Sequence, residues 1–410
     1  MKKFCFALLI AGMVGACFAG AAGAETSGPI RVSIDGDKQI YSVDPILMNG
    51  SVMVPMRAIL ASLGAGLHYD AKTRVITASK GDTRIVLKVG SHVAKVNDRE
   101  VKMNQPAVVI QGSTFVPVRF VSEALGAEVK WVPQVNTVVI LSAEILMLDA
   151  ALKEDNLEKF ASILKQAGNP TLANRSFLFV LNHKKGTEWV AAALDAGADV
   201  FKPFNIFHYA IMYKRTDVVK FLLDDGFVDP SAGSSDFPGY SYIGLAFFSG
   251  NIYTSDVRGN PLGTIQAGPS FEIAEALYEK GFRAETLDAY WTLASGQPEW
   301  FDWMLAHGAD PDGEIPKLVY LDEAENRIEF HSIQTMPDRK ATERLINAVY
   351  SVVSWNPSPE NLQMLETLIV KYGASLDPLT QAEKNRLLQL AKSKQMQSLV
   401  DSLIKAGAKV

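Results

Sequence analysis

Apolar residues in the last two thirds of the chain follow the spacing of amphipathic helices. The clearest example is the stretch 194–227, where apolar side chains recur every three or four positions in two short segments (Phe207, Ala210 and Ile211, then Val218, Val219, Leu222 and Leu223). Each segment has one narrow apolar face that cannot form a core alone, so the helices have to stack on neighbours. The pattern predicts an all-α domain over residues 143–410.

This helical pattern resembles the ankyrin repeat. The stretch Asn205–Ile211, NIFHYAI, stands where the family has T-P-L-H-x-A-A, and Asp217–Leu223 matches its second helix without a gap. Glycines close seven candidate second helices (Gly168, Gly197, Gly226, Gly281, Gly308, Gly373 and Gly407). The resemblance implies a solenoid of about seven degenerate repeats that binds a protein partner, in which His208 ties its helix start to neighbouring backbone.

Two of the intervals between these glycines are long, which indicates insertions near residues 250–269 and 314–336. The first is rich in turn formers and falls between the two helices of its repeat. In the second, residues 317–321 and 327–331 flank a turn and predict an enlarged β-hairpin. Specificity is expected in these insertions and in the finger loop after Asp199, whose candidate partner-binding residues are Phe201, Lys202 and Phe204.

Residues 25–142 show a different pattern, with short alternating strands and an internal duplication. The stretch Val54–Ala65, VPMRAILASLGA, recurs further along the chain as Val116–Ala127, VPVRFVSEALGA. Each copy predicts one short helix that begins at proline and stops at glycine, followed by a strand with an aromatic residue, Tyr69 or Trp131. Residues 83–89 and 92–101 also read as strands, with Asn97-Asp98 as the turn region before Arg99-Glu100, so this module is predicted to be α+β and strand-rich.

The doubled motif, with the turns at Asn49-Gly50 and Gln111-Gly112, resembles the copper amine oxidase N-terminal-like domain, a stalk module of bacterial surface proteins. In that family the copper chemistry belongs to another domain with three histidine ligands. Residues 25–142 contain only His68 and His92, which are far apart in the sequence, so no copper site is predicted here.

Arg57 and Arg119 occupy matching places in the two copies, and two interpretations of them remain open. A guanidinium binds phosphate or carboxylate in a fixed fork, so the pair could hold an anionic cell-wall polymer. Alternatively, each arginine ties the helix of its copy to the adjoining strand or turn. Repetition at equivalent positions favours the second interpretation.

Residues 1–24 read as an export signal. Lys2 and Lys3 precede an apolar run, and Ala22-Gly23-Ala24 forms a cleavage site. A competing interpretation is a lipobox at residues 14–17, which would make Cys17 a lipidated residue and anchor the protein to a membrane. The only other cysteine, Cys5, lies in the same segment, so the ordinary cleavage product has no thiol. We expect export to the cell surface, periplasm or extracellular space.

Charge and motifs restrict the classes of function. Residues 143–410 carry 35 acidic and 25 basic side chains, which argues against nucleic acid as the partner. The sequence has no P-loop, HExxH, dinucleotide GxGxxG or paired CxxC, so we predict no enzyme, cofactor or metal site. A group of aromatic residues at 290–303 could form a glycan or peptide platform, but the spacing of Trp300, Trp303 and Met304 favours packing between repeats.

These observations predict a non-enzymatic protein-binding scaffold of the bacterial cell envelope. The alternative is a cell-wall glycan-binding or anchoring protein that acts through residues 25–142.

Overall fold

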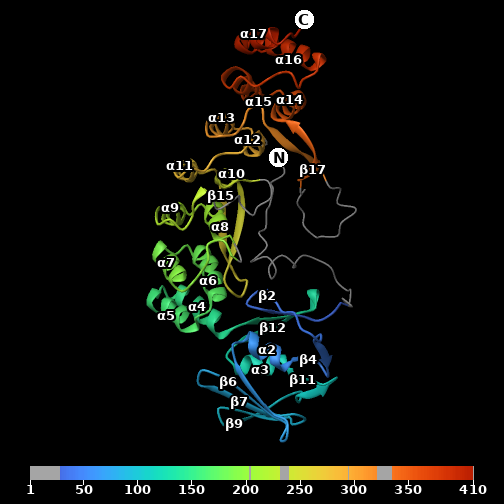
Figure 1. Ribbon diagram of the computed structural model, residues 1–410, viewed down its shortest axis with the longest axis vertical. Coiled ribbons are helices and arrows are strands. Elements are labelled where there is room, and N and C mark those ends of the chain that lie inside the picture. The colour runs from blue at the N-terminus through green and yellow to red at the C-terminus, as the bar shows by residue number, and fades with distance from the viewer. Residues whose placement is uncertain (1–27, 203–204, 231–239, 294, 321–334, 410) are drawn as a thin grey trace. The chain divides into compact units, whose positions relative to one another are not determined.

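The computed structural model describes residues 28–202, 205–230, 240–293, 295–320 and 335–409 (Figure 1). Contacts divide the chain into two compact units, which are described separately below. The N-terminal unit contains the described residues up to Ala198 together with Tyr253–Gly263, and the C-terminal unit contains Asp199–Ile252 and the residues from Thr264 onward. The expected signal segment 1–24, with Cys17, lies outside the described residues. Among the helices that are described, none is long and apolar enough to span a membrane.

The first part of the N-terminal unit is rich in strands, as the alternating pattern predicted (blue to cyan in Figure 1). Its elements are β1 (Arg31–Ile34), β2 (Asp37–Lys38), β3 (Ile46–Met48), β4 (Ser51–Pro55), α2 (Met56–Ser62), β5 (Gly66–Asp70), β6 (Val75–Lys80), β7 (Thr83–Lys88), β8 (Val93–Val96), β9 (Arg99–Lys102), β10 (Val108–Ile110), β11 (Ser113–Pro117), α3 (Val118–Ala124), β12 (Glu128–Val132), η1 (Pro133–Val135) and β13 (Thr137–Leu141). They form three sheets, with strand orders β12-β13-β1-β2, β10-β11-β4-β3 and β5-β6-β7-β8-β9.

The two copies of the duplicated motif meet in the middle of the second sheet. β4 and β11 are antiparallel, and Val54 lies opposite Val116, its equivalent in the second copy. Equivalent residues are therefore related by an approximate local two-fold axis. The helices α2 and α3 begin directly after Pro55 and Pro117, whose φ angles of −59° and −63° are those that the proline ring imposes.

Two helix pairs complete the N-terminal unit. Their helices are α4 (Ala143–Lys153), α5 (Leu157–Ala167), α6 (Pro170–Asn182) and α7 (Thr187–Asp195). Ser142 and Asn169 cap α4 and α6 by accepting hydrogen bonds from backbone N–H groups in the first turn. Phe160 and Trp189, with ring centroids 5.1 Å apart, pack α5 against α7. The helical faces that the sequence leaves too narrow for separate cores are thus buried against each other.

The C-terminal unit is mostly helical, with two β-hairpins. Its elements are α8 (Ile206–Met212), α9 (Thr216–Asp224), α10 (Tyr242–Ala246), β14 (Gly250–Ser255), β15 (Pro261–Ala267), α11 (Phe271–Glu279), α12 (Thr286–Leu293), α13 (Pro298–Ala306), β16 (Glu314–Tyr320), β17 (Thr335–Arg344), α14 (Leu345–Trp355), α15 (Pro359–Glu366), the π-helix η3 (Thr367–Lys371), α16 (Gln381–Ser393) and α17 (Gln397–Lys405). The tip of the β14–β15 hairpin, residues 253–263, belongs to the N-terminal unit.

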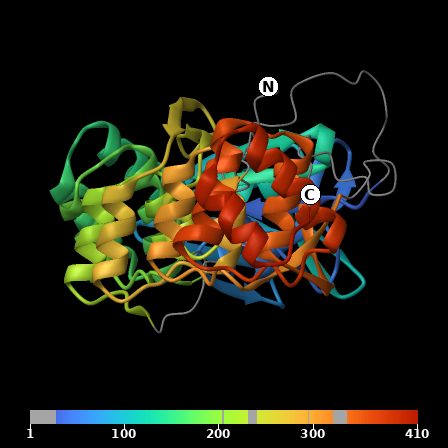
Figure 2. The same cartoon turned by 90° about the horizontal axis from the view of Figure 1, so that it is seen from above.

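Helices of the C-terminal unit pack in pairs, and successive pairs lie side by side from yellow to red (Figure 2). The first helix of one pair contacts the first helix of the next, as α8 does with α10 and α10 with α12. The seven glycines predicted to end second helices have positive φ angles, from 55° to 128°. The glycine spacing therefore located the ends of these helices correctly.

The hairpins differ in part from the prediction. β16 pairs with β17, but the second strand expected over 327–331 lies outside the described residues, and the partner of Tyr320 is Thr335. The stretch near 250–269, expected to be rich in turns, forms the β14–β15 hairpin between α10 and α11. Its glycines and Pro261 obscured the strand signal of Ile252, Tyr253 and Thr254.

Candidate functional site

The residues predicted to bind a partner lie in the loop before α8. Asp199 accepts a hydrogen bond from the backbone N–H of Phe201 at 2.8 Å, so the loop begins with a side-chain-stabilised turn. Phe201 is half-buried and Lys202 is exposed, whereas Phe204 lies outside the described residues. The backbone N–H of Ile206 donates to the carbonyl of Val200 at 2.7 Å and closes the loop at the start of α8. The described part of the loop therefore presents one cation beside a partly exposed ring.

Side-chain hydrogen bonds connect the starts of three successive first helices. Asn205 caps α8 by accepting from the N–H of His208 at 3.0 Å, and its amide donates to the Tyr242 hydroxyl at 2.8 Å, where α10 begins. Ser241 caps α10, and its hydroxyl donates to Asp288 on α12 at 2.6 Å. The surface beside the finger loop is therefore held in a fixed arrangement before any partner binds.

Asp288 is the most deeply buried acid of this region, with 1% of its surface exposed. Besides the Ser241 hydroxyl it accepts backbone N–H groups of Ser241 at 3.1 Å and Glu285 at 2.8 Å. Burial raises the pKa of Asp288 to about 6, although these hydrogen bonds favour the ionised form. A Cβ at Gly244 would collide with the Asp288 carboxylate, so the close approach of the two helices requires glycine there.

Two further buried groups of this region titrate away from their usual values. Burial lowers the pKa of His208 to about 4, so the imidazole is neutral at physiological pH. Burial also lowers the pKa of Lys214 to about 7, and its ammonium donates to the carbonyls of Leu245 and Ala246 at 3.1 and 2.8 Å. The Lys214 contacts tie the segment after α8 to the end of α10.

The predicted aromatic group packs within the C-terminal unit. Phe301 is fully buried, and Phe247 contacts the rings of Trp300 and Trp303 at 6.1 and 5.3 Å between centroids. Trp303 stacks on His307 at 3.8 Å and donates its indole N–H to Glu275 at 2.8 Å. The rings cover one another, so the packing interpretation of Trp300 and Trp303 is confirmed.

In the strand-rich part of the N-terminal unit, Arg119 and Arg57 differ. The Arg119 guanidinium donates to the carbonyl of Val129 at 3.0 Å and to Glu123 at 3.1 Å, which ties α3 to β12. Arg57 is exposed, and in the described part of the chain no hydrogen bond or ion pair involves its side chain. Of the two arginines, only Arg119 therefore ties the helix of its copy to the adjoining strand.

We expect Arg119→Ala to lower the free energy of unfolding by about 1 kcal/mol, because it removes an exposed ion pair and one hydrogen bond to a backbone carbonyl. Arg57→Ala, at the equivalent position, is the matched control and is expected to change it by less than about 0.5 kcal/mol. Urea unfolding followed by circular dichroism measures both. Equal losses in the two variants would show that the Val129 contact contributes nothing.

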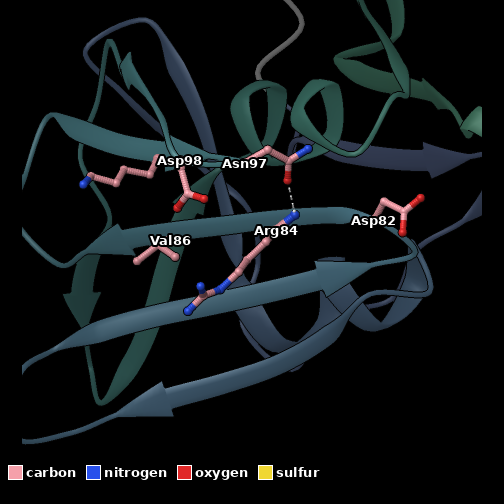
Figure 3. A pocket seen from close by; sticks show the side chains of 6 residues that line it. Asp82, Arg84, Val86, Asn97 and Asp98 are labelled. Carbon is pink, nitrogen blue, oxygen red and sulfur yellow. Dashed lines mark hydrogen bonds between the residues drawn. The ribbon is translucent and has the colours of Figure 1, made fainter.

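The outer face of the β5–β9 sheet carries a shallow hollow of about 370 Å³, lined by Asp82, Arg84, Val86, Lys95, Asn97 and Asp98 (Figure 3). The Asn97 side chain accepts the backbone N–H of Arg84 at 2.7 Å and fixes the turn between β8 and β9. His92 lies elsewhere, with Nδ1 3.1 Å from the Met103 carbonyl. Within the described residues, no group of three or more His, Cys, Asp or Glu side chains is placed to hold a metal ion.

A second charged cluster, which we call the Asp149 network, consists of Glu128, Asp149, Lys153, Asp256 and Arg258. Lys153 contacts Asp149 at 2.8 Å and Asp256 at 2.9 Å, and Arg258 contacts Glu128 at 2.9 Å and Asp149 at 3.1 Å. The Asp149 and Asp256 side chains are 2% and 4% exposed. Three carboxylates and two cations thus form one continuous cluster inside the N-terminal unit.

Hydrogen bonds keep both buried carboxylates ionised. Burial alone would raise the pKa of Asp256, but hydrogen bonds from Lys153, Asn260 and backbone N–H groups lower it to about 2. Burial likewise opposes ionisation of Asp149, whereas His183 and Lys153 lower its pKa below the usual value. His183 Nε2 stands 3.7 Å from Asp149 Oδ1, so the imidazole faces the carboxylate.

Asp149, Asp256 and Asp288 were not predicted from the sequence. Asp149 and Asp288 both occur as Leu-Asp-Ala inside an apolar helical segment, at positions where a solvated acid is not expected. An acid on a buried helical face needs internal partners, so this pattern could have marked both residues. No local pattern identifies Asp256, because its partner Lys153 lies 103 residues away.

Comparison with protein families agrees with these structures. Residues 33–140 match the family model of the copper amine oxidase N-terminal domain, and residues 203–232 match that of the ankyrin repeat. The chain joins a copper amine oxidase N-terminal domain to an ankyrin repeat. Both resemblances read from the sequence are thereby confirmed. The ankyrin repeat at 203–232 contains the finger residue Phe204, the cap Asn205 and the pair α8–α9.

The copper amine oxidase N-terminal domain also has a named relative. It is similar to a protein of Brevibacillus choshinensis described as "Protease inhibitor", with 31% identity over 117 residues. The matched region is 28% of this chain and 36% of that protein, so the chain spans about a third of the length of this curated relative. The ankyrin repeat supports protein–protein interaction in general.

Proposed function

We propose that this protein is an exported, non-enzymatic scaffold of the bacterial cell envelope, whose helix pairs form an ankyrin-type solenoid that binds a protein partner. The observation that carries the proposal is the set of hydrogen bonds that fixes the starts of α8, α10 and α12 beside the finger loop. A surface that is ordered before binding loses little conformational entropy when a partner docks. Lys202 and Phe201 of the finger loop are its candidate contact residues.

Contacts between successive second helices support a continuous stack in the C-terminal unit. Lys220 on α9 pairs with Glu272 on α11 at 2.7 Å, and Trp303 on α13 donates to Glu275 on α11. Lys371 of η3 pairs with Asp302 on α13. In a solenoid each repeat contacts only its neighbours, and these bridges join neighbours in that order.

Export rests on the N-terminal segment and on cysteine use. The segment 1–24 has the charged start, apolar run and small-residue site of a secretory signal, and Cys5 and Cys17 are the only cysteines. Mass spectrometry of the mature protein tests this assignment. A free N-terminus at Glu25 supports soluble export, a lipid-modified Cys17 places the protein on a membrane, and an intact Met1 would contradict export.

Binding through the ankyrin surface is tested with the full chain immobilised and exposed to envelope proteins of the producing bacterium. We expect the double variant Phe201→Ala with Lys202→Glu to lower capture of the bound protein at least tenfold, because both contacts lie in the finger loop. Lys165→Glu on α5 is the matched control, since it reverses the charge of another exposed lysine outside that loop. Equal capture by all three proteins would refute the proposed surface.

A second candidate is that the copper amine oxidase N-terminal domain binds a cell-wall polymer or a protease. The exposed cations Arg57, Arg84 and Lys95 are candidate contacts for an anionic polymer, with Asp82 and Asp98 beside the last two in the hollow, and the description of the named relative is the ground for a protease. Retention of the chain on protein-free cell walls, lost in Arg84→Glu with Lys95→Glu, would support the polymer. Slower substrate cleavage by a purified protease would support inhibition.

A further inference from the structure

We infer that the tip of the β14–β15 hairpin is a lock that fixes the copper amine oxidase N-terminal domain to the first two helix pairs. The tip comprises residues 253–263, and the helices α8, α9 and α10 separate it from α7 in the sequence. It nevertheless belongs to the same compact unit as β1–β13 and α4–α7. On this inference the N-terminal domain is one rigid body with these helices, and it does not act as a freely moving stalk.

The tip has its own rigid structure. The Asp256 carboxylate accepts the backbone N–H groups of Arg258 and Asn260, both at 2.9 Å, and the Asn260 side chain at 3.1 Å. The backbone N–H of Asp256 donates to the carbonyl of Asn260 at 2.9 Å. These bonds close a tight turn around one carboxylate, so Arg258 projects from an ordered base.

Three separate elements of the N-terminal unit hold this turn. Arg258 bonds Glu128 of β12 through Nε and Asp149 of α4 through Nη1. Lys153, one turn further along α4, bonds Asp256. On α6, the Asn182 side chain donates to the carbonyl of Ser255 at 3.1 Å. The tip therefore contacts one strand of the first sheet, β12, and also α4 and α6, which are the first helices of the two helix pairs.

Burial of the two carboxylates makes loss of a partner more costly here than at an ordinary surface ion pair. Asp149 and Asp256 are almost fully buried, and removal of a partner from a buried pair leaves an uncompensated charge. Arg258 is the residue that spans the domain and the helices, because one guanidinium reaches Glu128 and Asp149 at once. It is therefore the residue whose loss should release the lock.

Two other bridges show that the same junction is built to be fixed. Lys80 of β6 pairs with Glu144 of α4 at 2.8 Å. Arg175 of α6, with 8% of its side chain exposed, pairs with Asp37 of β2. These two bridges attach β6 and β2, and therefore two of the three sheets, to the helices. The hairpin tip adds a third point of attachment, at β12.

Spin labels measure the lock directly in the full chain. With Cys5→Ser and Cys17→Ser, labels are attached at Lys102→Cys on β9 and Lys165→Cys on α5, two exposed positions outside the network. Pulsed electron resonance then gives the distribution of distances between domain and helices. We expect a narrow distribution in the parent and at least a twofold broader one in Arg258→Ala. Arg386→Ala, an exposed arginine on α16, is the control and should leave it narrow.

Variants of Glu128 separate loss of the lock from loss of folding. Glu128→Arg places a second cation beside Arg258 and should broaden the distribution as Arg258→Ala does, whereas Glu128→Gln keeps an acceptor and should broaden it less, with native helix content by circular dichroism in all three variants. A distribution in Arg258→Ala and Glu128→Arg as narrow as in the parent would overturn the inference. The test does not depend on the proposed partner, because no partner is present.

Discussion

Replacing Asp149 by alanine is expected to lower the free energy of unfolding of the N-terminal unit by about 2–4 kcal/mol. The Asp149 side chain is 2% exposed and accepts hydrogen bonds from Lys153 and Arg258, which keep only Asp256 and Glu128 as partners when it is removed. The loss arises from these two charge-assisted hydrogen bonds and from the cavity left at a buried position. Urea unfolding followed by far-ultraviolet circular dichroism measures it.

Asp149→Asn is the informative companion variant. It keeps the shape and one hydrogen-bond acceptor but removes the charge, so we expect a similar loss of stability if the charge-assisted hydrogen bonds to Lys153 and Arg258 are decisive. Glu154→Ala, at the exposed end of α4, is the matched control and should cost less than about 0.5 kcal/mol. A loss below about 1 kcal/mol in both Asp149 variants would show that the network contributes little to stability.

Acid should weaken the same network. The pKa of Asp149 is lowered in the folded chain and that of Asp256 falls to about 2, so both groups bind protons more weakly when folded. Their contribution is therefore fully present above about pH 4, the value for an unfolded aspartate, and is lost as the pH falls towards 2. The Asp149→Asn variant should show a shallower loss over this range than the parent.

Asp288→Ala is expected to lower the free energy of unfolding of the C-terminal unit by about 2–4 kcal/mol. It leaves the Ser241 hydroxyl and the backbone N–H groups of Ser241 and Glu285 without their acceptor. Asp288→Asn retains one acceptor and no charge, so its cost should be smaller. Thermal unfolding of the full chain, followed by far-ultraviolet circular dichroism, measures both costs. Equal costs in the two variants would mean that the hydrogen bonds to Ser241 and Glu285 are not decisive.

The pH dependence of Asp288 has the opposite sign to that of the Asp149 network. Its folded pKa of about 6 lies above the usual value of 3.8, so the folded chain holds this proton more tightly than the unfolded chain. The stability from this group is fully present below about pH 4 and is lost as the pH rises through 6. Asp288→Asn should remove this slope, and a slope that persists in the variant would assign it to another group.

Local sequence patterns were sufficient for much of the fold. The repeated proline and glycine positions located α2 and α3 and the ends of the second helices, because backbone angles at those residues are set within a few positions. The pair Asn97-Asp98 likewise marked the turn between β8 and β9, where both residues have positive φ. Hydrophobic periodicity and turn-forming residues can be recognised within one short stretch of sequence.

The charged contacts were not predictable in the same way. Lys153 and Asp256 are separated by 103 positions, and Arg258 and Glu128 by 130, so only the folded chain shows that they meet. The two arginines of the duplicated motif illustrate the same limit. Arg57 and Arg119 are equivalent in sequence, yet among the described contacts only Arg119 reaches a strand carbonyl.

The pairing of β4 with β11 has a consequence for the origin of the N-terminal domain. A protein with a single copy of the motif would leave β4 with an open edge, and a second molecule could close that edge with its own β4, Val54 opposite Val54. The present domain, with Val54 opposite Val116, has the arrangement of such an isologous dimer joined into one chain. Because both copies lie in one chain, they need not be identical: Arg119 bonds the Val129 carbonyl, whereas the Arg57 side chain is exposed.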